Sequence, residues 1–239
     1  FASRYLKLGE KVLARYADEV VTLSEEMHQY FLDTYGRDTA LVKNAISIIP
    51  PTDDHLLREA YGLEKGSYIL YIGRLSPEKG PQDLIAAYKR AGVSQKLVIA
   101  GEMPDNDFGR ELTALIDGDE NIVLPGFVSG DTMHALYSNC ALYVLPSHTE
   151  GLALTLLEAM SCGANCLVSD IVENTAVLGD FGHAFAVSDI DDLARALRES
   201  VDDTRSPEAV DAQIAHIREH YSYDRVIDEM MTIYRKVKK

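Results

Sequence analysis

The chain has 239 residues, 46 % of them hydrophobic and 26 % charged, a composition that is typical of globular proteins and excludes a disordered or fibrous chain. Acidic residues outnumber basic ones by 38 to 23, for a formal charge of −15. We therefore expect no binding to nucleic acid and no docking of this segment on an anionic membrane, since both need a surplus of cations. No apolar run approaches the roughly 18–20 residues of a membrane-spanning helix, so we expect no membrane insertion by this segment.

The N-terminal 42 residues predict a helix, a strand over Glu19–Leu23 and a second helix that begins at Ser24, a favourable N-cap. The chain starts without Met and without the pattern of a signal peptide. We therefore expect it to be the interior of a longer chain, with residues 1–42 forming the end of a preceding domain. Two consecutive prolines interrupt regular structure afterwards, and residues 43–54 are predicted to be a linker.

Short β-rich runs then alternate with helical patterns through residues 55–205, and the runs are mostly continuous apolar stretches, as in parallel strands buried on both faces. The predicted strands are Tyr68–Ile72, Lys96–Ala100, Asn121–Leu124, Ala141–Leu145, Asn165–Ser169 and Ala184–Val187. The predicted helices are Pro81–Ala91, Phe108–Asp117, Asp131–Asn139, Leu152–Ser161 and Asp191–Ser200, followed within residues 206–239 by Val210–His220 and Tyr223–Val237. This alternation predicts an α/β fold, a doubly wound Rossmann-like parallel sheet with helices on both faces.

Three cysteines, Cys140, Cys162 and Cys166, lie in stretches of apolar or small residues. Their odd number and the absence of a second pair at metal-ligand spacing favour structural thiols over a disulfide or a zinc site. We therefore expect a reducing compartment, that is, a cytoplasmic protein, and no bound metal.

The first segment whose residues could bind a ligand runs from Ile72 to Gly80, directly after a predicted strand and before a helix. Gly73 permits a tight turn at the strand end, where open α/β sheets bind ligands. Arg74 and Lys79 are the cations of this segment, and between Arg110 and Arg195 there is no Lys or Arg at all. From these residues alone an anion site and an ordinary surface loop remain equally open.

The second segment follows another predicted strand, from Pro146 to Met160. Glu150 would lie in the loop and Glu158, eight positions later, about two turns into the helix. The two carboxylates could accept hydrogen bonds from a polyol, and the backbone N–H groups of residues 151–153 could face an anion. For an arbitrary pair of glutamates, a solvated helix carboxylate and a favourable helix N-terminus are the more common explanation.

Taken together and in order, these motifs resemble the C-terminal, donor-binding half of a retaining GT-B glycosyltransferase of group 1 (family 4). The residues that carry the resemblance are Tyr71–Gly80, Leu97–Gly101, Val123–Val128, Ala141–Ser147, Glu150–Gly163 and Val168–Ile171. One such motif would be weak evidence, whereas the whole set in this order is strong evidence.

The resemblance implies that a nucleoside-diphosphate sugar binds at the carboxyl ends of the strands. Arg74 and Lys79 would hold the diphosphate, Glu150 the donor sugar and Glu158 the ribose. The remaining donor-binding residues would be Gly73, Gly126, Phe127 and Val128 near the base, and Gly151, Leu152 and Ala153 at the phosphates. Arg74, Lys79 and Glu150 are the expected catalytic residues, with no cofactor and no metal.

Several positions depart from the family pattern. Ala153 and Thr155 replace a frequent Gly and Pro, and Ala176 replaces a frequent carboxylate, which weakens any assignment of the sugar. We interpret His148 as a residue that lines or caps the site rather than as a catalytic base, because a retaining mechanism needs none. His134 and His183 are interpreted as surface or packing residues.

The resemblance also predicts the partners. The acceptor, a sugar or a lipid-linked glycan of cell-envelope polysaccharide synthesis, would bind through an N-terminal domain of which residues 1–42 are the end, and residues 206–239 would pack back toward it. The full-length protein could then lie at the inner face of the membrane, and this segment alone would be inactive. The alternatives are a non-catalytic nucleotide-sugar sensor or scaffold and a sugar-nucleotide epimerase. A dinucleotide dehydrogenase is disfavoured because no Gly-x-Gly-x-x-Gly follows the early strands.

Overall fold

The computed structural model describes residues 2–48 and 50–238 of the chain. The contacts within it define two compact units: Ile48–Arg218 form the larger one, and Phe1–Ser47 together with Glu219–Lys239 form the smaller one. The chain passes from the smaller to the larger unit inside the segment that the sequence predicts as a linker. Each unit has its own secondary structure and is described separately.

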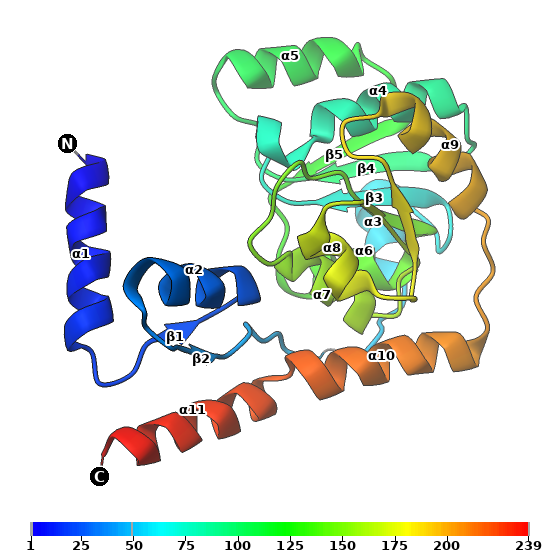
Figure 1. Ribbon diagram of the computed structural model, residues 1–239. Coiled ribbons are helices and arrows are strands. Elements are labelled where there is room, and N and C mark those ends of the chain that lie inside the picture. The colour runs from blue at the N-terminus through cyan, green and yellow to red at the C-terminus, as the bar shows by residue number, and fades with distance from the viewer. Residues whose placement is uncertain (1, 49, 239) are drawn as a thin grey trace. The chain divides into compact units, whose positions relative to one another are not determined.

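The larger unit is built on one parallel sheet, which in the described residues has six strands (Figure 1). The strands are β3 (Tyr68–Ile72), β4 (Lys96–Ala100), β5 (Ile122–Gly126), β6 (Leu142–Leu145), β7 (Cys166–Ser169) and β8 (His183–Phe185). Their order across the sheet is β5-β4-β3-β6-β7-β8, and every neighbouring pair is parallel. The order therefore reverses between β3 and β6, which is the topological switch point of the sheet. The predicted doubly wound α/β fold is confirmed.

Helices cover both faces of this sheet (Figure 1). On one face lie α4 (Pro81–Ala91), α5 (Asp107–Ile116) and α9 (Ile190–Ser200); on the other lie α3 (His55–Tyr61), α6 (Gly130–Asn139), α7 (Leu154–Ser161) and α8 (Val172–Leu178). Successive side chains of a strand point to opposite faces, so β3 supplies Ile69 and Tyr71 to the core under α4 and α9. The whole of β3 is buried, which explains its continuous apolar sequence.

Several elements differ from the sequence prediction. The helix α7 begins at Leu154, two residues later than predicted, because Glu150–Ala153 form a loop. The structure adds β2 (Ala40–Leu41), α3 and α8, which the sequence analysis did not predict. Of these, α8 contains two valines, a threonine and an asparagine in seven residues, and no side chain caps its start. Such residues are poor helix formers, so packing rather than intrinsic propensity stabilises this helix.

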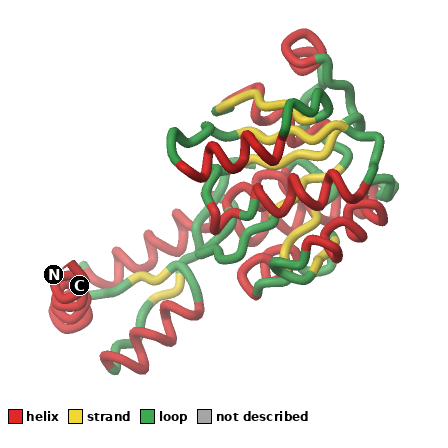
Figure 2. Tube along the Cα trace, turned by 90° about the horizontal axis from the view of Figure 1, so that it is seen from above, coloured by secondary structure: helices red, strands yellow, loops and turns green. Residues whose placement is uncertain are grey.

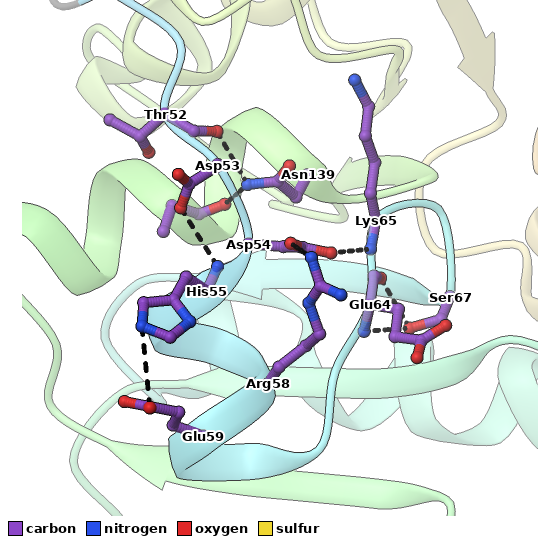
Figure 3. Close-up of polar contacts among 11 residues, drawn as sticks. Thr52, Asp53, Asp54, His55, Arg58, Glu59, Glu64, Lys65, Ser67 and Asn139 are labelled. Carbon is purple, nitrogen blue, oxygen red and sulfur yellow. Dashed lines mark hydrogen bonds and ion pairs between the residues drawn. The ribbon is translucent and has the colours of Figure 1, made fainter.

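Polar contacts fix the start of the larger unit against α6 and α3 (Figure 3). The backbone N–H of Thr52 donates to Ser138 Oγ over 3.1 Å, and Asn139 Nδ2 donates to the carbonyl of Thr52 over 3.0 Å. Asp54, whose residue is buried, accepts the backbone N–H of Lys65 over 3.0 Å and pairs with Arg58. These bonds hold the carboxylate ionised, so the pKa of Asp54 lies below its usual value. The chain is thus held in place from Thr52 onward.

The smaller unit contains α1 (Ala2–Tyr16), β1 (Val21–Thr22), α2 (Glu25–Tyr35), β2 and α11 (Tyr223–Val237). The strands β1 and β2 are parallel and appear as two short yellow segments in Figure 2. A small core of Ala14, Val20 and Phe31 joins α1 to α2. The predicted helix start at Ser24 is confirmed, since its hydroxyl accepts the backbone N–H of Met27 over 3.2 Å. The helix α10 (Pro207–Tyr221) continues from the larger unit into this one.

The three cysteines are free thiols, as predicted. Cys162 and Cys166 are buried and Cys140 is half-buried, and burial raises the pKa of all three thiols. They are therefore protonated and poorly nucleophilic. Among the described residues no helix has the length and apolar character needed to cross a bilayer.

Candidate functional site

Two loops meet at the switch point of the sheet, one after β3 and one after β6. The backbone after β3 is held tightly: Gly73 N–H donates to the Ala100 carbonyl over 3.0 Å, and the hydroxyl of Tyr71 donates to the Arg74 carbonyl over 2.7 Å. A Cβ on Gly101, at the end of β4, would stand 2.2 Å from the carbonyl oxygen of Gly73. Glycine is therefore required there, because the ends of the two strands approach backbone to backbone.

A cavity of about 830 Å³ opens at this carboxyl edge of the sheet. It is lined by the loops after β3, β4 and β5 and by two side chains of α7, and a volume of this size accommodates a ligand of several hundred daltons. Five of the residues predicted to bind the donor line it: Gly73, Arg74, Phe127, Val128 and Glu158. Phe127 is 78 % exposed, and a ring presented to solvent beside a cavity can stack on a planar ligand.

The other predicted residues do not line this cavity; they are Lys79, Gly126, Glu150, Gly151, Leu152 and Ala153. Lys79 and Glu150 form an ion pair instead, with Nζ and Oε1 2.7 Å apart and side chains only 20 % and 6 % exposed. Ser147 Oγ donates to the same Glu150 oxygen over 2.7 Å. The two predicted motifs, although 71 residues apart in sequence at these positions, are therefore joined by a buried charge pair.

The turn that carries Lys79 is fixed by a glycine. Pro77–Lys79 form a single 3₁₀ turn, and Gly80 closes it with φ of +70°. A Cβ on Gly80 would stand 2.2 Å from the carbonyl oxygen of Pro146, so the turn packs directly on the loop after β6. A backbone hydrogen bond from His148 N–H to the Glu78 carbonyl, 2.9 Å long, adds to this contact.

Arg74 is the cation on the cavity itself. Its side chain is 79 % exposed, and its Nη2 lies 3.9 Å from Glu78 Oε1, a distance at which exposed charges attract each other weakly. Ser76 also donates to Glu78 over 2.7 Å, and this hydrogen bond together with Arg74 lowers the pKa of Glu78. Arg74 can therefore leave its partner for an anionic ligand at little expense.

Glu158, in the second turn of α7, lines the cavity together with Thr155, and we call this part of the lining the floor. The sequence analysis placed it about two turns into the helix; it is nearer the start because α7 begins at Leu154. Burial raises the pKa of its carboxyl, and a 3.0 Å hydrogen bond from the Tyr137 hydroxyl to Oε2 acts in the opposite direction. Glu158 is thus a half-buried acceptor rather than a solvated helix carboxylate.

The sequence analysis missed the loop after β4, whose residues 102–106 line the cavity. In the sequence, Asp105, Asn106 and Asp107 have the pattern of a turn and a helix cap. Asn106 does cap α5, accepting the Gly109 N–H over 3.1 Å, but it also borders the cavity. The signal was present, because this loop follows a buried strand and a glycine, as Gly73 follows β3. Thr155, noted only as a departure from a family pattern, also lines the cavity.

The histidines occupy different settings. His148 Nε2 lies 2.6 Å from Asp83 Oδ2, in the first turn of α4, and is not part of the cavity lining. His183, at the opposite end of its strand, pairs with Asp203 over 3.0 Å and is partly exposed. No group of three or more His, Cys, Asp or Glu side chains in the described part of the chain is placed to hold a metal ion.

The six-stranded parallel sheet, with helices on both faces and a cavity at its switch point, matches the donor-binding C-terminal half of GT-B glycosyltransferases. The model of the family "Glycosyl transferases group 1" matches residues 53–216, which is most of the chain. The chain belongs to this family.

Two curated relatives are about a quarter identical to the chain over the residues that align. It is 26 % identical over 182 residues to the O-antigen chain mannosyltransferase B of Escherichia coli, a match that covers 74 % of this chain and 48 % of that protein. An uncharacterized glycosyltransferase of Methanocaldococcus jannaschii is 25 % identical over 232 residues, with 91 % and 60 % covered. The chain therefore spans about half the length of these relatives.

Solved structures share the fold at lower identity. The crystal structure of Anabaena Alr3699/HepE in complex with UDP and glucose superposes with a TM-score of 0.84 at 20 % identity, and the match covers 100 % of this chain and 68 % of that one. Sucrose-phosphate synthase from Thermosynechococcus elongatus superposes with a TM-score of 0.81 at 21 % identity, with 98 % and 62 % covered.

Proposed function

We propose that this chain is the donor-binding part of a glycosyltransferase that moves a sugar from a nucleoside diphosphate to an acceptor with retention of anomeric configuration and without a metal ion. The observation that carries the proposal is the cavity at the switch point, with Arg74 and Glu158 in its lining and the Lys79–Glu150 pair on the two loops that meet there. Structures with the same fold contain UDP or UDP-glucose, which supports a nucleotide-sugar donor.

The proposed roles follow from the chemistry of the side chains. Arg74 binds the diphosphate, because its exposed guanidinium can exchange Glu78 for phosphate oxygens. Lys79 supplies a second positive charge as the bond between the anomeric carbon and the diphosphate oxygen breaks and negative charge develops on the leaving group. Glu150, held by Lys79 and Ser147, accepts hydrogen bonds from the donor sugar. These two cations take the place that a metal ion has in other sugar transfer reactions.

The remaining predicted residues complete the donor site in this proposal. Glu158 accepts hydrogen bonds from the ribose hydroxyls. Phe127 stacks on the nucleobase, with its neighbours Gly126 and Val128 beside it. The backbone N–H groups of Gly151, Leu152 and Ala153, just before α7, bind the phosphates. By analogy with the named relative of Escherichia coli, the product would be a polysaccharide of the cell envelope.

The acceptor, a sugar or a lipid-linked glycan, would bind in the proposal to a domain of which residues 1–42 form the end. Residues 43–54 would link that domain to the donor domain over 55–205, and residues 206–239 would return to it. In the structure, residues 219–239 share the smaller unit with residues 1–47. Lys236 Nζ, for example, lies 2.7 Å from Glu19 Oε2.

Calorimetric titration of the chain with UDP, GDP and ADP tests the proposed donor site. We expect one of the three to bind, and the double variant Arg74→Ala with Lys79→Ala to lose at least tenfold in affinity, which corresponds to about 1.4 kcal/mol. The matched control is Arg90→Ala, since Arg90 is an exposed cation of α4 that pairs with Asp191 outside the cavity. Unchanged affinity in the double variant would contradict the proposal.

Turnover tests the reaction rather than the binding. The donor in this assay is a sugar derivative of the nucleotide that binds in the titration. A protein that contains this chain and has the full length of its relatives should transfer the sugar from that donor to an acceptor, with retention of anomeric configuration. Binding without turnover would identify a sensor or scaffold, and release of an isomerised nucleotide or sugar would identify an epimerase.

A further inference from the structure

Two tyrosines lie directly behind the cavity floor. Tyr137, on α6, and Tyr143, on β6, are both fully buried, with ring centroids 5.6 Å apart and ring planes at 66°. This edge-to-face arrangement is favourable for aromatic pairs and fixes both rings. Burial raises the pKa of both phenols far above its usual value, so each hydroxyl is a neutral donor throughout the physiological pH range.

Each phenol reaches one cavity-lining side chain of α7. Tyr137 donates to Glu158 Oε2 over 3.0 Å, and Tyr143 donates to Thr155 Oγ1 over 2.9 Å. Thr155 and Glu158 are three positions apart and so share one face of the helix. Both line the cavity. The two tyrosines thus support the two α7 side chains that a ligand would meet.

The direction of these bonds determines what the cavity offers. Because Tyr143 donates to Thr155, the threonine hydroxyl keeps its own proton to donate. Because Tyr137 donates to Oε2 of Glu158, the carboxylate is held in one orientation and its Oε1 is left to accept hydrogen bonds from a ligand. The floor therefore presents one directed donor and one directed acceptor, which is the pattern that binds a sugar ring with neighbouring hydroxyls.

We propose that Tyr137 and Tyr143 are positioning residues that orient Glu158 and Thr155 to bind the ribose of the nucleotide donor. This inference rests on the proposed function. Neither tyrosine touches the ligand in it; each acts through the α7 side chain to which it donates. An undirected Glu158 carboxylate or Thr155 hydroxyl would have to lose rotational freedom on binding, which lowers affinity.

A third buried tyrosine supplies the matched control. Tyr68, on β3, is also fully buried, and its hydroxyl donates over 2.8 Å to the backbone carbonyl of Leu136 in α6. Neither residue lines the cavity. Tyr68→Phe therefore removes a buried phenol hydroxyl from the same region without removing a bond to a cavity side chain.

The test measures by calorimetry the affinity of the 239-residue chain for whichever of UDP, GDP and ADP it binds. Tyr137→Phe should weaken binding about tenfold, the effect of one hydrogen bond to a charged acceptor, whereas Tyr68→Phe should leave it unchanged. In a Glu158→Gln background, Tyr137→Phe should have little further effect, because its route to the ligand is already lost. Tyr143→Phe and Thr155→Val form a second, independent cycle, with a smaller loss of about threefold.

The pH profile adds a readout that a purely structural role would not move. The titratable groups that act on Glu158 are Tyr137 and His134 from α6, both of which lower the pKa of its carboxyl against the effect of burial. Arg74 lines the same cavity, and the Cys162 thiol responds to the Glu158 charge. Loss of the Tyr137 hydroxyl raises the pKa of Glu158 further. Binding needs the ionised carboxylate. As the pH is lowered, Tyr137→Phe should therefore lose binding at a higher pH than the wild type does.

The outcomes separate the two proposals. If the wild type binds a nucleotide and Tyr137→Phe behaves as Tyr68→Phe does, or weakens binding equally with and without Glu158, the positioning role is wrong and the donor site stands. If the wild type binds none of UDP, GDP and ADP, the proposed donor site fails and the positioning role fails with it. Thermal unfolding of each variant confirms that the loss of affinity is measured on folded protein.

Discussion

Two ion pairs between a cation and a glutamate lie on the loops of the site, and they differ in distance and burial: the rim pair, Arg74–Glu78, whose arginine lines the cavity, and the inner pair, Lys79–Glu150, which does not line it. At the rim, Arg74 and Glu78 are exposed and 3.9 Å apart. In the inner pair, Lys79 and Glu150 are largely buried and 2.7 Å apart. An exposed pair contributes little to stability and exchanges partners easily, whereas a buried pair cannot lose one member without leaving a charge that is not compensated. The rim pair is thus suited to capture an anion, whereas the inner pair, whatever charge Lys79 also offers a ligand, holds two loops together.

The largest expected effect is that of breaking the inner ion pair, Lys79–Glu150. Lys79→Ala leaves Glu150, only 6 % exposed, without its cation, and should lower the free energy of unfolding by about 3 kcal/mol. Urea unfolding measures this loss. The matched variant Arg74→Ala should leave the midpoint unchanged, because its pair is exposed. Equal destabilisation by the two variants would show that the rim pair and the inner pair do not differ in their contribution to stability.

The next effect concerns the 3₁₀ turn that carries Lys79 of the inner pair. Gly80 and Gly92 share a positive φ, but a Cβ would collide with the Pro146 carbonyl at Gly80 and meet nothing within 4 Å at Gly92. Gly80→Ala should therefore be about 2 kcal/mol more destabilising than Gly92→Ala in thermal unfolding. Similar values for the two variants would show that the turn does not depend on close packing against the loop after β6.

A smaller effect is expected at the rim, and in affinity rather than stability. Arg74→Ala should weaken UDP or GDP binding about tenfold, and its effect should shrink as salt is added, because its charge is exposed and screened. Titrations at low and high ionic strength measure both. An effect independent of salt would indicate that Arg74 acts through packing.

The smallest effect concerns Glu158, a carboxylate paired with a phenol instead of a cation. Burial raises its pKa in the folded state, so ionisation opposes folding. Glu158→Gln should raise the free energy of unfolding by about 0.5–2 kcal/mol at neutral pH while weakening nucleotide binding. The gain should be absent at acid pH, where the carboxyl is protonated in both states, and should grow as pH rises toward the raised pKa. Unfolding curves over this range test the sign.

Sequence reasoning succeeded where a local signal marks a boundary. Both α4 and α11 have the predicted bounds, and α4 starts with a proline and is followed by Gly92. It failed where packing decides: α8 has no side-chain cap at its start and four poor helix formers among its seven residues, and β2 is two residues long. At the site, the strand-end rule predicted Arg74 and Glu158, and both line the cavity. The same rule was not applied to the loop after β4, so residues 102–106 were missed.

No pattern in the sequence indicates which predicted residues meet each other. That Lys79 pairs with Glu150, and not with Glu78 beside it, depends on the register of β3 against β6 and on the contact of Gly80 with Pro146. The hydrogen bonds from Tyr137 and Tyr143 to α7 likewise depend on how two helices and a strand pack. Such pairings are long-range consequences of the fold.

The three protonated thiols make the chain its own reporter of unfolding. Cys162 and Cys166 are buried in the folded protein, and all three thiols have a raised pKa, so an alkylating reagent should modify them only when the structure opens. Mass spectrometry after timed alkylation would then count opening events at three places in one unit, without any engineered label. A cysteine introduced on the surface could, for the same reason, be labelled selectively in the folded protein.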